Sequence, residues 1–280
     1  MTIRIVTDST SDLPPALASE HGIEVVPLNV HFGNEVFKDG TEITPDQFFE
    51  KLIKGPVHPT TSQPSIGEFV DLYKKIAKKG DEIISIHISQ ILSGTYNSAL
   101  QASKNLESEI NIHVVDSEQV SMSLGFSAMA AAQTANQGGS VEEVISAAES
   151  TADKSRFVVL LDTLEYLAKG GRIGKAQSLL GGLLKIRPIL TVENGEIAPY
   201  GKARSRKAGL SKLEQAIRSF GDIEEIYVMY STDTTDAEIV AEKVSDLLPA
   251  GKTPMVIRVG PVIGTHAGPD LVALGCLTAV

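Results

Sequence analysis

The segment IRIVTDSTSDLP, residues 3–14, carries the pattern that decides the fold. Residues 3–7 form a short β-branched run that predicts a strand, and the polar residues 8–12 predict a loop after it. Pro14 then favours the first turn of a helix, where its missing N–H is not needed. The order strand, polar loop, helix is the unit from which α/β proteins are built.

The same unit recurs through the first half of the chain. Ser65-Ile66-Gly67-Glu68 and Ser140-Val141-Glu142-Glu143 are capping boxes that predict helix starts, the first helix running to Lys79. Residues 82–88 and 111–115 predict strands, and 122–135 a buried helix. Since strands separated by helices pair in parallel, we predict an N-terminal α/β domain over residues 1–155, with a mostly parallel sheet flanked by helices.

The second half of the chain has a different order of predicted strands and helices. Two strands, 189–192 and 196–200, flank Asn194-Gly195, which predicts a β-hairpin. A helix from Ser205, a strand at 226–230, a helix at 236–248 and a strand at 255–259 follow. We therefore expect a C-terminal α/β domain with a mixed sheet over residues 156–280.

Composition limits the classes of function. The net charge of -10 opposes nucleic-acid binding, which needs a positive surface. The single cysteine, Cys276, cannot form an internal disulfide, so we expect a reducing, cytoplasmic compartment. The N-terminus lacks the layout of a secretory signal, and no apolar stretch predicts stable membrane insertion.

Hydroxyl-rich loops are the first candidate site. Thr61 and Ser62 lie in a stretch stiffened by Pro59 and Pro64, and Ser93-Gly94-Thr95 enters a predicted helix. Hydroxyls and free N–H groups at helix starts are receptors for carboxylate or phosphate, and Gly94 would allow a ligand close to the backbone. Ordinary capping is the alternative. We favour capping for Thr60 and Ser65, and a ligand for Thr61 and Ser93.

A tightly constrained loop at residues 260–269 presents His266. Its glycines and prolines fix the backbone around that imidazole, so we count His266 as a site residue. The other histidines are interpreted as ordinary surface or core residues: His21, His31, His58, His87 and His113. No second His or Cys stands at metal-ligand spacing, so no metal site is expected.

Two basic segments stand out against the acidic background. Arg172 lies in a glycine-rich turn within residues 164–174, and Arg204 and Arg206 lie within 201–207. The three arginines indicate a dock for a partner or a phosphate group. The alternative is that they pair with acidic side chains. Gly251-Lys252-Thr253 is not a phosphate-binding loop, because it precedes a predicted strand instead of following one.

Together these segments resemble the DegV family of bacterial fatty-acid-binding proteins, the acyl-carrying subunits of fatty acid kinases. The matching stretches lie in the expected order over nearly the whole chain: residues 8–14, 61–65, 93–99, 114–117, 164–174, 187–190 and 260–268. Pro269-Asp270 departs from the family pattern, in which Pro-Gly is common at this place.

The resemblance implies a function without a cofactor. The protein would bind a long-chain fatty acid and present its carboxylate to a separate ATP-dependent kinase for acyl phosphate formation. Thr61 and Ser93 would bind the carboxylate, and His266 would lie in the same polar cluster. The resemblance also implies a lipid slot, which we assign to the C-terminal domain.

Two alternatives come from other functional classes. An acyl hydrolase could use Ser93 and His266, although the sequence lacks a Gly-x-Ser-x-Gly nucleophile turn at that serine. A DNA-associated regulator is disfavoured by the acidic charge. We therefore expect a lipid-binding subunit that is not itself an enzyme.

Overall fold

The computed structural model describes residues 2–180 and 186–279. The chain divides into two compact units, of which the first comprises Met1–Asn29 and Thr61–Asp153 and the second Val30–Thr60 and Lys154–Val280. The boundary expected between residues 155 and 156 lies near one of the passages between units. It does not account for Val30–Thr60, which groups with the second unit.

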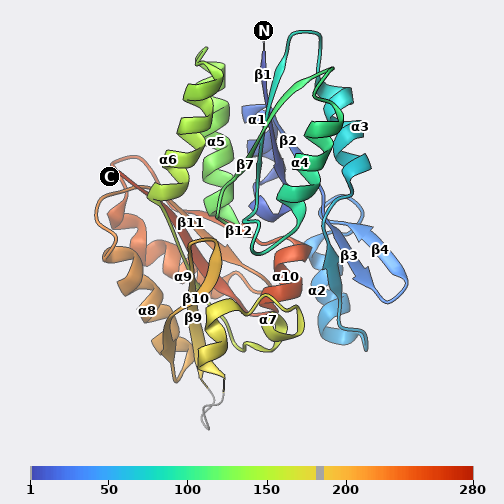
Figure 1. Ribbon diagram of the computed structural model, residues 1–280. Helices are drawn as coiled ribbons and strands as arrows, with labels where there is room; N and C mark the ends of the chain where they lie inside the picture. The colour runs from blue at the N-terminus through green and yellow to red at the C-terminus, as the bar shows by residue number, and fades with distance from the viewer. Residues whose placement is uncertain (1, 181–185, 280) are drawn as a thin grey trace. The chain divides into compact units, whose positions relative to one another are not determined.

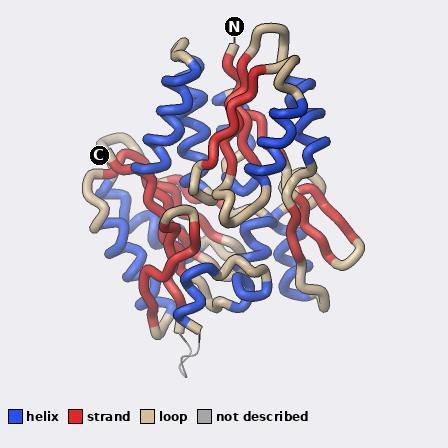
Figure 2. Tube along the Cα trace, in the orientation of Figure 1, coloured by secondary structure: helices blue, strands red, loops and turns tan. Residues whose placement is uncertain are grey.

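The elements are traced in Figures 1 and 2. The strands are β1 (Ile3–Asp8), β2 (Ile23–Val26), β3 (Asn29–Phe32), β4 (Glu35–Lys38), β5 (Thr60–Ser62), β6 (Glu82–His87), β7 (Asn111–Asp116), β8 (Ser155–Leu160), β9 (Arg187–Glu193), β10 (Glu196–Ala203), β11 (Ile223–Tyr230), β12 (Met255–Arg258) and β13 (Val272–Thr278). The α-helices are α1 (Pro15–His21), α2 (Pro45–Lys54), α3 (Ile66–Ile76), α4 (Thr95–Asn105), α5 (Met122–Asn136), α6 (Val141–Lys154), α7 (Glu165–Lys169), α8 (Arg206–Arg218), α9 (Thr235–Val244) and α10 (Pro261–Ala267).

The first unit is built on a parallel sheet in the order β2-β1-β6-β7. Helices α3 and α4 pack on one face, where Val6 and Ile83 meet Phe69, Tyr73 and Ala99. Helix α5 packs against β1 and β6 and is buried along most of its length. The parallel sheet and the buried helix predicted from the sequence are therefore confirmed.

Helix ends in this unit follow local side-chain chemistry. The capping boxes at Ser65 and Ser140 form as predicted, with Glu68 and Glu143 as their partners. Helix α3 was predicted to reach Lys79 but ends at Ile76, because Ala77 adopts an extended conformation. Gly22 ends α1 in the left-handed region at φ 68°, as expected of a glycine at this place.

The second unit contains a six-stranded mixed sheet in the order β10-β9-β8-β13-β11-β12. Strands β11 and β12 pair in parallel, and the other neighbours are antiparallel. Asn194 and Gly195, at φ 51° and 74°, form the predicted hairpin turn. Helices α8 and α9 cover a core that includes Leu160, Leu213 and Val228.

Two elements of the second unit differ from the predictions. Residues 261–267, predicted as a loop, form helix α10, since Pro261 occupies its first turn and Gly268 follows its end. Strand β13 was not predicted, although it is central in the sheet. Its run Val-Ala-Leu-Gly-Cys-Leu-Thr is buried at nearly every position and so lacks the alternation of a half-exposed strand.

Aromatic packing explains why Val30–Thr60 groups with the second unit. Helix α2 places Phe48 and Phe49 against Gly264 of α10, so close that a Cβ there would lie 2.7 Å and 2.6 Å from ring atoms. Arg258 of β12 lies over the Phe49 ring and bonds Asp46 at the start of α2. The chain passes from one unit to the other within β3 and β5.

Among residues 2–180 and 186–279, no helix has the length and apolar character needed to cross a membrane.

We expect Gly264→Ala to lower the free energy of unfolding by about 1–3 kcal/mol, because the new methyl group overlaps two buried rings. Gly201→Ala in β10 is the matched control, since a Cβ at that position would have no neighbouring atom within 4 Å. Urea denaturation of both variants measures the difference. Equal stability of the two variants would contradict the packing argument.

Candidate functional site

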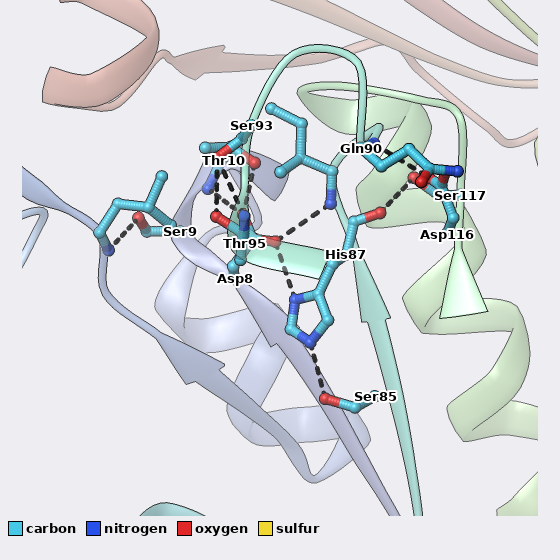
Figure 3. Close-up of polar contacts among 12 residues, drawn as sticks. Asp8, Ser9, Thr10, Ser85, His87, Gln90, Ser93, Thr95, Asp116 and Ser117 are labelled. Carbon is cyan, nitrogen blue, oxygen red and sulfur yellow. Dashed lines mark hydrogen bonds and ion pairs between the residues drawn. The ribbon is translucent and has the colours of Figure 1, made fainter. Parts of the chain in front are cut away.

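Polar loops gather at the carboxyl edge of the parallel sheet (Figure 3). The turn Ser9–Ser11 follows β1, residues 88–94 follow β6, and Ser117 follows β7. Hydrogen bonds tie these loops together: Ser117 donates from its N–H and its hydroxyl to the carbonyl of His87, and the Gln90 N–H donates to Asp116. Ligands of open parallel sheets bind at this edge.

The loop that ends at Thr95 presents a partly exposed hydroxyl at a helix start. Ser93 Oγ lies 2.8 Å from Thr95 Oγ1 and accepts from the Thr95 N–H at 3.3 Å. Thr95 is fully buried, whereas Ser93 is half-buried. Helix α4 begins at Thr95, so its N-terminal dipole favours an anion at Ser93.

Gln63 brings the second hydroxyl loop to the first. Its side chain crosses Gly94 and donates to Ser98 Oγ at 3.2 Å, and Asn29 donates to Ser62 Oγ at 3.2 Å. Thr61 and Ser62 therefore belong to the same part of the first unit as Ser93. A Cβ at Gly94 would overlap the Gln63 amide, so the Gln63 side chain packs directly against the backbone at this glycine.

The same unit contains a buried chain of hydrogen bonds that is not predicted from the sequence. His87 contacts Asp8 Oδ2 through Nδ1 at 3.0 Å and Ser85 Oγ through Nε2 at 2.7 Å. The Tyr73 hydroxyl donates to the same Ser85 oxygen at 2.8 Å. His87 had been interpreted as an ordinary histidine. The sequence does carry a signal for a polar role of His87, because Ser85 and His87 lie two positions apart, and therefore on one face, in a strand rich in isoleucine.

His266 lies in the second unit, on α10. Its ring fills the space beside Gly170 of α7, and the ring of Tyr166 fills the space beside Gly268, so a Cβ at either glycine would clash. His58 lies 5.6 Å from Tyr166 between ring centroids. Burial, followed by the charges of Arg172 and His58, lowers the pKa of His266 to about 4. Above that pH His266 is neutral.

Arg172 lies in the same region of the second unit. Its Nη1 donates to the carbonyl of Gly170 at 2.7 Å, and its charge contributes to the low pKa of His266. The side chain is exposed. The glycine-rich turn therefore holds a guanidinium close to the imidazole, with Gly171 and Gly174 in the left-handed region at φ 68° and 51°.

Arg204 and Arg206 have different surroundings. Arg204 is exposed and lines a hollow of about 480 Å³ together with Ile186, Lys202, Ala203, Ala208 and Lys212. Arg206 donates to Asp236 at 2.6 Å and to Asp162 at 3.4 Å, and it also bonds the carbonyl of Asp270. Pairing with acidic side chains, the alternative raised for these arginines, is thus the arrangement of Arg206.

The conformation of Asp270 explains how this chain can carry Pro-Asp where Pro-Gly is common. Its φ is 59°, a left-handed conformation in which glycine is favoured and Asp is tolerated. The carboxylate accepts from the Thr232 hydroxyl at 2.7 Å, and the Asp270 N–H donates to the same hydroxyl at 3.2 Å. The turn after His266 is therefore kept without the glycine.

Sequence comparison supports one family throughout the chain. A family model described as "Uncharacterised protein, DegV family" matches residues 2–279. A DegV domain-containing protein of Streptomyces coelicolor is 40% identical over 97% of this chain and 97% of its own length. Protein DegV of Bacillus subtilis is 36% identical over 96% of each chain.

Solved structures agree with the sequence comparison. A Thermus thermophilus DegV family protein described by its fatty acid binding superposes with a TM-score of 0.91 at 34% identity, covering 99% of this chain and 100% of its own. DegV from Bacillus subtilis, described as a fatty acid binding protein, gives 0.89 at 33% identity over 99% and 100%. A stearic-acid-binding protein from Eubacterium ventriosum gives 0.89 at 28% over 99% and 98%. With this family match over nearly every residue and this α/β architecture, the chain belongs to the DegV family.

Proposed function

We propose that this protein binds a long-chain fatty acid and presents its carboxylate to a separate ATP-dependent kinase, which forms the acyl phosphate. The observation that carries the proposal is the junction of two hydroxyl loops, Thr61-Ser62 and Ser93-Gly94-Thr95, through Gln63 at the start of α4. Full-length relatives described as fatty-acid-binding proteins support the choice of ligand.

The two ends of a fatty acid have separate roles in this proposal. Each buried methylene contributes about 0.8 kcal/mol, so a long acyl tail supplies on the order of 10 kcal/mol before the costs of binding. A hydrogen bond to a charged group contributes about 1.5–3 kcal/mol. The tail therefore supplies most of the affinity, while Thr61 and Ser93 orient the carboxylate.

The arginines supply the link to the kinase. Transfer of a phosphoryl group to a carboxylate brings several negative charges together, and a guanidinium matches the geometry of phosphate and carboxylate. Arg172 is exposed beside His266, and Arg204 is exposed at a basic hollow. We assign both to the kinase interface, together with Arg206, which lies two positions after Arg204.

An acyl hydrolase fits these residues less well. Asp8, His87 and Ser85 are linked in the order of a hydrolase triad, but all three are fully buried. A substrate carbonyl cannot reach Ser85 within the sheet. Ser93 is accessible, and its hydroxyl is shared with Thr95. Turnover of an activated acyl ester would favour the hydrolase over the binding protein.

Protein purified from bacteria should carry one fatty acid, and removing that lipid should lower its melting temperature. A ligand that binds only the folded state stabilises it by mass action. Native mass spectrometry and a thermal shift titration with palmitate or oleate measure the two effects. The proposal fails if no acyl chain is extracted and neither acid raises the melting temperature.

Thr61→Ala and Ser93→Ala should impair phosphorylation by the kinase more than lipid retention. Each removes a hydrogen bond of about 1.5–3 kcal/mol to the carboxylate and leaves the tail contacts intact. Thr60→Ala is the control, since neighbouring side chains of a strand point to opposite faces. Unchanged phosphorylation in the Thr61/Ser93 double variant would exclude both residues from the carboxylate site.

Arg172→Ala and Arg204→Ala should keep lipid binding but lower kinase-dependent acyl phosphate formation and its sensitivity to salt. Arg218→Ala is the control, because that guanidinium is bonded to Asp246 and Glu214 away from these segments. Arg206→Ala tests the remaining arginine, with a stability measurement to detect loss of its ion pairs. Loss of lipid with no specific defect in phosphorylation would place the arginines in the lipid pocket.

A further inference from the structure

The buried carboxylate of Asp8 accepts four hydrogen bonds. Its Oδ1 accepts from the N–H of Thr10 at 3.0 Å and from the Thr10 hydroxyl, and its Oδ2 accepts from His87 Nδ1 at 3.0 Å and from the N–H of Ile88 at 3.1 Å. Four donors occupy the four lone-pair positions of a carboxylate. Asp8 is fully buried, so these bonds replace water entirely (Figure 3).

These four bonds connect two loops that are distant in sequence. Thr10 lies in the turn after β1, and Ile88 is the first residue of the loop that carries Ser93. The same loop is closed internally, because the N–H groups of Leu92 and Ser93 both donate to the carbonyl of Ser89. The position of Asp8 therefore fixes where the Ser93 loop begins.

The hydrogen bonds around His87 fit one tautomer of its ring. The Asp8 carboxylate can only accept, so His87 Nδ1 carries a hydrogen. The Ser85 hydroxyl, which accepts from Tyr73, has its own hydrogen to donate to His87 Nε2. With Nε2 as acceptor, the neutral ring carries its hydrogen on Nδ1 and donates it to Asp8. Burial raises the pKa of Tyr73, so the phenol at the head of the chain stays protonated.

We propose that Asp8 and His87 are positioning residues that hold the Ser93 hydroxyl in place for the fatty-acid carboxylate, an inference that rests on the proposed function. Neither side chain touches the ligand, since both are fully buried. A buried carboxylate costs several kcal/mol in desolvation and is matched here by four donors that all belong to the site's own framework. Preorganised hydroxyls bind a carboxylate without first having to be ordered.

A matched pair of variants at His87 isolates the hydrogen bond to Asp8. Asn and Leu have nearly the same shape, but only Asn offers an N–H close to the place of Nδ1. His87→Leu should weaken palmitate binding about tenfold, as expected for one misplaced hydrogen bond to a charged group. His87→Asn should recover most of that loss.

Methyl palmitate is the ligand control, because it has the acyl tail but no carboxylate. Its affinity should be the same in wild type, His87→Leu and His87→Asn. A merely structural role would weaken palmitate and methyl palmitate by the same factor, and that result would overturn the proposal. Combining His87→Leu with Ser93→Ala should add little to either single loss, since both act on one hydrogen bond. Additive losses would likewise overturn it.

Two measurements need no ligand and separate this inference from the proposed function. In the wild type, nitrogen NMR of His87 should show hydrogen on Nδ1, and a hydrogen on Nε2 would overturn the chain. Amide exchange at Thr10 and Ile88 should accelerate in His87→Leu and less in His87→Asn, whereas unchanged exchange would show that His87 does not hold Asp8 between the two loops. The wild type could also fail to bind palmitate while these two results are as expected. That outcome would reject the proposed function and the role of Asp8 and His87 in ligand binding. It would leave intact the conclusion that the two residues connect the loops after β1 and β6.

Discussion

The parallel pairing of β1 with β6 is the constraint on which the first unit's chemistry depends. Their register sets Val6 opposite Ser85, so Asp8 and His87 end their strands at the same edge of the sheet. Antiparallel neighbours would send the two following loops to opposite edges. Because the strands run the same way, one carboxylate can bond the loop after β1 and the loop after β6, although 79 residues separate Asp8 from His87.

Local signals in the sequence were sufficient for most elements of the fold. The capping boxes at Ser65 and Ser140 and the turn at Asn194-Gly195 are determined by neighbouring residues, and they appear as predicted. Helix α10 was not foreseen, because Gly264 within it weakens the helical pattern. That glycine is required by the rings of Phe48 and Phe49, which are more than 200 positions away in the chain.

Contacts between residues far apart in the sequence also limit what can be predicted of the candidate site. The hydroxyls at Thr61 and Ser93 can be picked out from their loops, because Pro, Gly and short polar residues cluster there. The role of Gln63 cannot, since its partner Ser98 lies 35 residues further on. The sequence alone classes His87 with the ordinary histidines, because its contact with Asp8 exists only after β1 and β6 pair. The sequence of one strand shows which of its residues are polar, whereas their partners on other strands are known only once the sheet has formed.

Glycines in the second unit act by leaving room for rings. The His266 ring of α10 packs against Gly170 at the end of α7, and the Tyr166 ring of α7 packs against Gly268 at the end of α10. Each ring thus contacts backbone that carries no side chain. This contact buries the His266 ring enough to keep it neutral near physiological pH. A neutral imidazole can donate one hydrogen bond and accept another, whereas an imidazolium would add a charge beside Arg172. The packing therefore selects the form of His266 that can coexist with a neighbouring guanidinium.

The basic side chains of the second unit differ in how far neighbouring carboxylates neutralise them. Arg187 and Arg206 both bond Asp162, and Arg206 also bonds Asp236, so much of their charge is neutralised within the unit. Arg204, Lys202 and Lys212 instead line one hollow, where Lys212 bonds the carbonyl of Lys202. None of the described residues that line this hollow carries a carboxylate. In a chain with a net charge of -10, such a group attracts an anionic partner only if acidic side chains stay away from it. Sequence clustering put Arg204 and Arg206 together, but the carboxylates around Arg206 separate their electrostatic roles.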